Sequence, residues 1–177
     1  GDPDWAGGRV FRDEREIAIE APDWAVFRAV CRVGGGHGWY AAGWLWRIRG
    51  WIDLLVGGPG LRRGRRNPDT IGYGEALDFW RVVGLERGRR LALRAEMKLP
   101  GEALIEFRIE PKDANRSTLQ QRALFYPRGL AGLLYWYAVA PLHQIVFRGM
   151  LLGIEREALK IAAGAKEAGG IKDTLHP

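Results

Sequence analysis

Three polar side chains lie within apolar stretches of this chain. A polar group in such surroundings is a candidate for transferring a proton or orienting a ligand. His143 lies in a long apolar segment, and Asp78 and Gln121 share the alternation of apolar residues in two predicted strands. A neutral imidazole can donate or accept a hydrogen bond or act as a general base, and a buried polar group must find a partner. His143 and Asp78 are therefore the candidate catalytic residues, and Gln121 and His143 are candidate ligand-binding residues.

The same residues have ordinary structural explanations. His143 can be a hydrogen-bonded structural histidine, and Asp78 can lie in solvent at the mouth of a strand or pair with an arginine. Catalysis would need a nucleophile or a second titrating group near His143. Its neighbours Tyr135, Tyr137 and Gln144 form no known catalytic constellation. The decision depends on geometry, because a His143 outside any pocket would exclude the catalytic interpretation.

The elements that must position these residues begin with four runs in which apolar and polar residues alternate. Period-two alternation is typical of an antiparallel sheet with one buried and one solvated face. Short turns and a polar loop at residues 112–116 separate the runs. The predicted strands cover residues 76–83, 90–98, 102–110 and 117–126.

Two shorter patterns precede these strands. Residues 13–20 alternate weakly, with Ile17 and Ile19 on one side, and predict a first strand. A helix then opens near Asp23, because apolar residues recur there at spacings of three and four. Residues 41–56 predict a second helix, which a glycine-rich turn ends.

The last predicted helix covers residues 129–163, and Pro141 should kink or break it. Its first part, residues 129–147, carries no formal charge between Arg128 and Arg148, which is long enough for a membrane span. A proline, a histidine and a glutamine interrupt this stretch, however, and a sheet with a matching apolar face precedes it. We therefore expect a buried helix and no transmembrane span.

An antiparallel sheet that folds around one long helix can enclose a cavity, and the inward residues would line it. The alternative is a solid core without a ligand. In the segment of three successive aromatic residues that ends at Tyr137, at most two can face one pocket, and we favour Trp136. The predicted ligand-binding residues are Trp80, Leu93, Met97, Phe107, Gln121, Phe125, Trp136 and His143.

One basic cluster stands out in a chain whose formal charge is +6. Arginine binds phosphate well through paired contacts, so the cluster is a candidate anion site. A solvated loop or a contact between domains would explain it equally. No aromatic residues interleave with the arginines, which disfavours nucleic-acid binding. The cluster consists of Arg62, Arg63, Arg65 and Arg66.

Four segments resemble a bacterial domain of unknown function in the START and polyketide-cyclase-like (SRPBCC, helix-grip) superfamily. They are residues 57–66 (GGPGLRRGRR), 76–82 (ALDFWRV), 93–101 (LRAEMKLPG) and 127–137 (PRGLAGLLYWY). The resemblance covers roughly residues 2–156 and implies an α+β fold. In that fold a curved antiparallel sheet wraps a long C-terminal helix, with two short helices after the first strand. In longer proteins the domain follows a Rossmann-type, epimerase-like NAD(P)-binding domain.

Composition sets further bounds. The 177 residues suit one domain, predicted at residues 1–163, with a polar and flexible tail at residues 164–177. Cys31 is the single cysteine, which fits a reducing cytoplasm. The chain has neither an initiator methionine nor a signal segment, so we interpret it as a fragment. No dinucleotide-binding or metal-ligand pattern occurs, so any NAD(P) would belong to the neighbouring Rossmann-type domain, and no metal is expected.

Three functions remain open at this point. The domain could bind a small hydrophobic or amphipathic ligand in an internal cavity, as an accessory to the Rossmann-type domain. It could be a cyclase-like or hydrolase-like enzyme that uses His143 with Asp78 or Gln121. It could also be a structural module that supports the neighbouring domain or an oligomer. The sequence alone does not identify the ligand.

Overall fold

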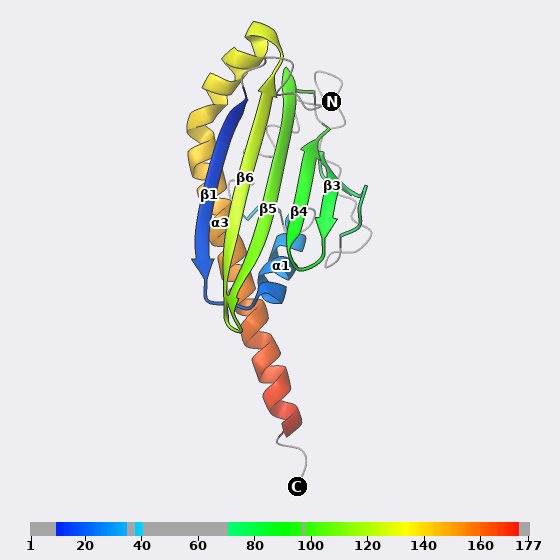
Figure 1. Cartoon of the computed structure of the whole chain (residues 1–177), viewed down its shortest axis with the longest axis vertical. Helices are drawn as coiled ribbons and strands as arrows, with labels where there is room; N and C mark the ends of the chain where they lie inside the picture. The colour runs from blue at the N-terminus through cyan, green and yellow to red at the C-terminus, as the bar shows by residue number, and fades with distance from the viewer. Residues whose placement is uncertain (1–9, 35–37, 41–70, 97, 174–177) are drawn as a thin grey trace.

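The structure is a computed structural model that describes residues 10–34, 38–40, 71–96 and 98–173. The second predicted helix at residues 41–56, the arginine cluster and Met97 lie outside the described residues. The rest of the predicted α+β arrangement is present: Figure 1 shows one curved antiparallel sheet with the last helix running along it.

Among the described residues, six strands form the sheet in the order β1-β6-β5-β4-β3-β2, and every neighbouring pair is antiparallel. The apolar side of each strand faces the helices, because it is buried there while the polar side meets water. The strands are β1 (Phe11–Ile19), β2 (Ala76–Leu77), β3 (Trp80–Glu86), β4 (Arg90–Ala95), β5 (Gly101–Asp113) and β6 (Arg116–Pro127).

The long β5–β6 hairpin corrects the predicted polar loop at residues 112–116. Both strands continue almost to the tip, and only Ala114 and Asn115 form the turn. The Asp113 carboxylate accepts the backbone N–H of Asn115 at 2.9 Å, which is a local side-chain turn that tightens the connection. The prediction missed it because polar residues are typical of loops and of exposed strand ends alike.

The predicted strand at residues 76–83 is in fact two strands joined by a tight turn. β2 ends at Leu77 and β3 begins at Trp80, and Asp78 has a positive φ of 54°. Aspartate adopts this left-handed conformation more readily than most residues. Phe79 in the turn is buried, so the apolar pattern continues through the chain reversal. The periodicity of the sequence therefore gives no sign of the turn.

The last helix, α3, runs without a break from Gly129 to Asp173, so the predicted break at Pro141 is wrong, and the predicted kink stays a prediction. Proline leaves the carbonyl of Tyr137 without its usual donor. Pro141 and Tyr137 both lie on the exposed side of the helix, where water can bond that carbonyl. Figure 1 shows α3 curving along the sheet. The helix also passes the predicted domain end at residue 163; the flexibility of the tail stays a prediction.

The inner stripe of α3 forms much of the core. Its buried residues recur at helical spacing and pack against the sheet and against α1 (Asp23–Cys31). An ion pair of 2.6 Å between Arg32 and Glu157 joins the end of α1 to α3. The stripe consists of Val146, Phe147, Met150, Leu151, Ile154, Ala158 and Ala162.

The start of α3 approaches the sheet closely at Gly132. A Cβ added there would meet the Pro100 carbonyl oxygen and lie 2.7 Å from the Pro127 Cβ. Backbone and proline ring cannot move aside easily, so only glycine allows this approach. Gly164, in the same helix, has nothing within 4 Å of such a Cβ.

We predict that Gly132→Ala lowers the free energy of unfolding by about 1–3 kcal/mol, because the added methyl group overpacks this contact. Gly164→Ala is the matched control and should raise it by up to about 1 kcal/mol through helix propensity. Urea titration of both variants measures the difference. Equal stability of the two variants would show that the close approach is not as described.

Candidate functional site

An ion pair on the inner face of β1 points at α3. Arg15 donates from Nε and Nη2 to the two oxygens of Asp13, both at 2.8 Å, and from Nη1 to the Gln144 carbonyl of α3 at 3.2 Å. The guanidinium carbon also lies 6.0 Å from the centre of the Phe147 ring. Sequence reasoning missed this pair, although Asp13 and Arg15 share the parity of Ile17.

Gln121 faces the same space from β6. It lies directly opposite Arg15 on one side and Phe107 on the other. Phe125, with the same parity, stacks on Trp136 of α3, so this face of β6 is the one that α3 covers. Gln121 is only 1% exposed, and neither its Oε1 nor its Nε2 has a hydrogen-bond partner. An unpaired buried amide is costly, so Gln121 marks a place where a partner is expected.

His143 completes the cluster from the helix side. Its ring lies 5.0 Å from Trp136 and 4.8 Å from Phe147, centroid to centroid, and its buried Nδ1 has no hydrogen-bond partner. Burial lowers the pKa of His143 below its ordinary value of 6.5, Asp13 opposes this shift, and Arg15 adds to it. The imidazole is therefore neutral at pH 7. We call Asp13, Arg15, Gln121 and His143 the interior polar cluster.

Aromatic rings border the interior polar cluster toward the start of α3. Trp136 stacks on Phe11 at 4.8 Å and on Phe125 at 5.7 Å, with interplanar angles of 18° and 12°. Tyr135 lies 5.6 Å from Phe125, and the neighbouring Tyr137 is 61% exposed. The expectation that Trp136 is the inward residue of this segment agrees with these contacts.

Of the remaining predicted residues, Phe107 lies directly opposite Gln121 in the sheet, and Leu93 and Trp80 lie further along the strand order. Leu93 and Phe107 are fully buried in the centre of the core. Trp80 lies 5.9 Å from both Trp39 and Phe79, near the opposite end of the strand order from β1. The structure thus brings Gln121, Phe125, Trp136 and His143 together and separates them from Trp80.

Asp78 belongs to the Trp80 side and not to the interior polar cluster. Its Oδ2 accepts the indole N–H of Trp39 at 2.8 Å, and the carboxylate is buried. The turn between β2 and β3 lies at the far end of the strand order from β1. The geometry therefore does not join Asp78 to His143 as a catalytic pair, and it gives the carboxylate a visible structural role.

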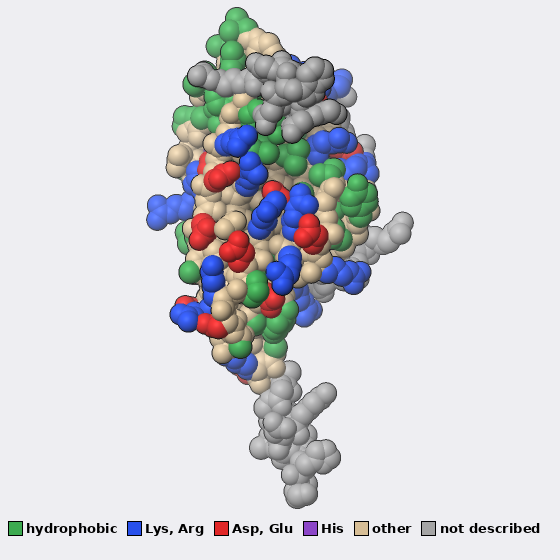
Figure 2. Space-filling view, in the orientation of Figure 1, with side chains coloured by type: hydrophobic (Ala, Val, Ile, Leu, Met, Phe, Trp, Pro, Cys, Tyr) green, Lys and Arg blue, Asp and Glu red, His purple; other side chains and the backbone are tan. Residues whose placement is uncertain are grey.

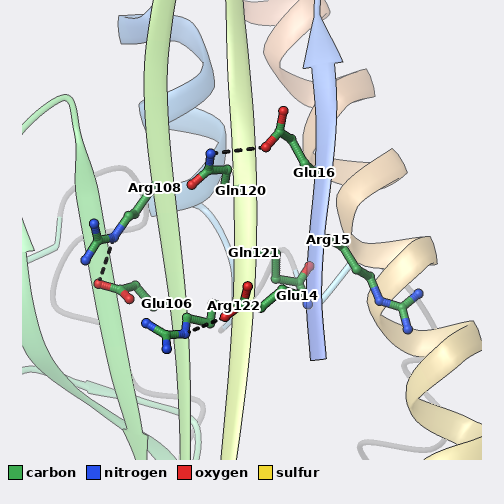
Figure 3. A pocket seen from close by; sticks show the side chains of 8 residues that line it. All are labelled: Glu14, Arg15, Glu16, Glu106, Arg108, Gln120, Gln121 and Arg122. Atoms are coloured by element: carbon green, nitrogen blue, oxygen red, sulfur yellow. Dashed lines mark hydrogen bonds and ion pairs between the residues drawn. The ribbon is translucent and has the colours of Figure 1, made fainter. Parts of the chain in front are cut away.

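A groove of about 410 Å³ lies over β1, β6 and β5 (Figure 3), and its lining includes Arg15 and Gln121 beside side chains of the outer face of the sheet. Its side chains bond one another: Arg122 pairs with Glu14 at 2.8 Å, and Gln120 donates to Glu16 at 3.1 Å. Figure 2 shows acidic and basic groups intermixed over this face. Exposed pairs of this kind contribute little stability, and the face is an ordinary solvated one. The internal cavity stays a prediction.

The outer side of α3 is exposed and apolar. Its largest exposed residues include Leu130 at 71%, Leu134 at 63% and Ile145 at 67%. By length and composition alone, residues Gly129–Glu167 could cross a membrane, and 17% of the most apolar window is buried. A core helix passes the same test, and the inner stripe of α3 packs on the sheet. The absence of a span stays a prediction.

Metal ligands do not gather in the part of the chain that the structure describes. No group of three or more His, Cys, Asp or Glu residues is arranged there to hold an ion. Cys31 is buried in α1. The predicted anion site lies in the segment that the structure does not describe, so it is not tested.

The sheet, the long final helix and the enclosed inner face define a helix-grip protein. Three solved structures have this architecture at 11–15% sequence identity, which establishes the fold alone. The Zhui aromatase/cyclase from Streptomyces sp. R1128 is 15% identical, with a TM-score of 0.53 over 86% of this chain and 95% of its own. Ara h 8.0201 is 14% identical, with a TM-score of 0.52 over 86% and 99%. Norcoclaurine synthase from Thalictrum flavum is 11% identical, with a TM-score of 0.51 over 84% and 93%.

Within this class, the chain belongs to the family described as "Protein of unknown function (DUF2867)", whose model matches residues 5–150. The family match confirms the predicted domain of unknown function, and the solved structures confirm the predicted α+β helix-grip fold. No curated protein matches the chain. The predicted position after a Rossmann-type domain is not part of these findings.

We predict that His143 makes stability depend on pH. Because its pKa is lower in the folded than in the unfolded protein, the unfolded state binds more protons between the two values. The contribution is fully present above about pH 6.5 and is lost as the pH falls through the folded pKa. Urea unfolding between pH 8 and pH 5 measures it, and NMR titration of the imidazole gives the pKa directly. His143→Gln assigns the NMR signal of the imidazole and should reduce the dependence of the free energy of unfolding on pH in this range. A pKa of His143 at or above 6.5 in the folded protein would contradict the described burial.

Asp78 gives a second prediction. Asp78→Ala should lower the free energy of unfolding by about 1–3 kcal/mol, because it leaves the buried Trp39 indole N–H unpaired and removes a residue suited to positive φ. Asp78→Asn keeps an acceptor oxygen and tolerates the same backbone conformation, so it should lose clearly less. Thermal and urea unfolding compare the two. A large loss for the asparagine variant and none for alanine would exclude this structural role.

Proposed function

We propose that this domain binds a small hydrophobic or amphipathic ligand between the inner face of the sheet and α3. One observation carries the proposal: Gln121 is 1% exposed, yet both of its polar atoms lack a partner. Nearly all buried polar groups in proteins are hydrogen-bonded, so such a residue points to a missing group. Apolar surroundings with a few convergent polar groups are typical of ligand sites.

The surroundings fit an aromatic or flat apolar ligand. The rings of Phe11, Trp136 and Phe125 stack on one another beside the interior polar cluster, so the apolar wall of the site is largely aromatic. Rings of this kind favour stacked or edge contacts with another aromatic group. The similar solved structures include an aromatase/cyclase and norcoclaurine synthase, which supports the proposal at the level of the fold.

Binding explains the geometry better than acid–base catalysis does. A catalytic histidine is usually oriented by a hydrogen bond to its second ring nitrogen. Asp13 is the carboxylate whose charge acts on the pKa of His143, but it accepts hydrogen bonds from both Nε and Nη2 of Arg15. Nδ1 of His143 has no hydrogen-bond partner. The cyclase or hydrolase alternative therefore lacks its orienting group among the described residues.

We further propose that the domain serves as an accessory to a Rossmann-type domain of the same parent protein, as the resemblance of the sequence implies. Any NAD(P) would bind to that domain, and a cytoplasmic location follows from the reducing environment that Cys31 suits. A purely structural module is the competing view. Deleting the domain from the parent protein separates the two, because unchanged ligand selectivity after deletion would favour the structural role.

We predict that the uncharged fluorescent probe N-phenyl-1-naphthylamine binds to the native protein and that Trp136→Ala weakens this binding by about tenfold, because it removes an aromatic contact surface. Leu134→Ala is the matched control, since Leu134 lies two residues earlier in the same helix and is 63% exposed. Fluorescence titration gives both dissociation constants, and near-ultraviolet circular dichroism checks that each variant is folded. Equal affinities of the two variants would place the probe outside the proposed site.

A further inference from the structure

We infer that the buried end of the ligand is an uncharged group that both donates and accepts hydrogen bonds, such as a carboxamide, and that it pairs with Gln121. This inference rests on the proposed function, because it names the chemical class that the same site selects. It depends on three features of the interior polar cluster, namely the free amide, the closed ion pair and the neutral imidazole.

The free amide sets the hydrogen-bonding pattern. Gln121 offers acceptor sites on Oε1 and two donors on Nε2, and neither atom has a partner. This conclusion does not depend on which way the amide is turned, because both of its ends are unpaired. A ligand group with only donors or only acceptors would leave one end of the amide unsatisfied. A group that carries both can satisfy both ends, as one amide does for another.

The ion pair explains why the ligand should carry no charge. Asp13 and Arg15 neutralise each other through two hydrogen bonds, and the third bond of Arg15 goes to the Gln144 carbonyl. These bonds use three of the five N–H donors of Arg15, and Asp13 neutralises its charge, so an incoming carboxylate would be repelled by Asp13 as it approached the guanidinium. An incoming cation would be repelled by Arg15 in the same way. Placing an unpaired charge in such a site costs far more than placing a neutral polar group there.

The imidazole adds a second contact without adding charge. His143 is neutral at pH 7, because burial lowers its pKa. Its unpaired Nδ1 can serve one further donor or acceptor of the ligand, according to the tautomer. Its ring, held between Trp136 and Phe147, leaves this nitrogen in largely apolar surroundings. Both orphaned groups of the cluster thus favour a neutral polar partner.

Three probes that share the naphthalene ring test the inference by isothermal titration calorimetry at pH 7. Naphthalene has no polar group, 2-naphthamide has an uncharged donor and acceptor, and 2-naphthoate has the shape of the amide with a negative charge. We expect 2-naphthamide to bind at least about tenfold more tightly than the other two, as one or two buried hydrogen bonds would give.

Two glutamine variants identify the residue responsible. Gln121→Leu should remove the advantage of 2-naphthamide over naphthalene while keeping or improving the binding of naphthalene itself. Gln120→Leu is the matched control, because Gln120 is the preceding residue and bonds Glu16 on the outer face of the sheet. It should leave the order of the three affinities unchanged. Circular dichroism and urea unfolding confirm that both variants fold.

The outcomes separate this inference from the proposed function. If none of the three probes binds to the wild-type protein, the proposed function fails and the inference fails with it. If naphthalene binds and 2-naphthamide binds no more tightly, ligand binding stands and the inference is overturned, because a trapped water would then satisfy Gln121. Tightest binding of 2-naphthoate would also overturn it and would indicate an anion site at Arg15.

Discussion

The packing of α3 across the inner face of the sheet is the contact on which the rest of this structure depends. It removes from water one side of β6 and β1, and α1 packs beside it on β5 and β6, so every residue of inward parity there must be apolar or find a partner. Most are apolar and form the core with the inner stripe of the helix. A few are polar, and among the described residues the buried atoms without a hydrogen-bond partner include both polar atoms of Gln121 and Nδ1 of His143.

Only some of the polar groups in the interior polar cluster have partners. Asp13 and Arg15 neutralise each other near the edge strand β1, where both side chains keep 17% of their surface exposed. Gln121 lies one strand further in and has no such escape, because Phe107 and Arg15 flank it in the register. The cluster therefore begins at the edge of the sheet with a partly exposed ion pair whose charges are paired. It ends further inside with a buried amide that has no hydrogen-bond partner. This gradient gives the proposed ligand site its direction, with the polar end of the ligand buried.

The alternation of apolar and polar residues was sufficient to predict most of the sheet. Alternate side chains of a strand point to opposite faces, so burial of one face produces this alternation directly. It failed where a second effect opposed it. Buried Phe79 carried the apolar pattern through the Asp78 turn, and the exposed setting of Pro141 let the helix continue. Arg15 was missed because a charged residue in a strand is normally predicted to face solvent. Its ion pair with Asp13, two positions earlier, is what allows it to face inward.

The sequence by itself determined which residues share a face, since the pleat of a strand fixes parity without reference to the rest of the molecule. It therefore placed Gln121 with Phe125 and predicted a helix that would cover them. Only the tertiary structure decided which inward polar groups would find partners. The register brought Arg15 and Gln121 side by side, and the path of α3 added His143. Hydrogen bonding depends on such distances between segments far apart in the chain, and no local pattern encodes them.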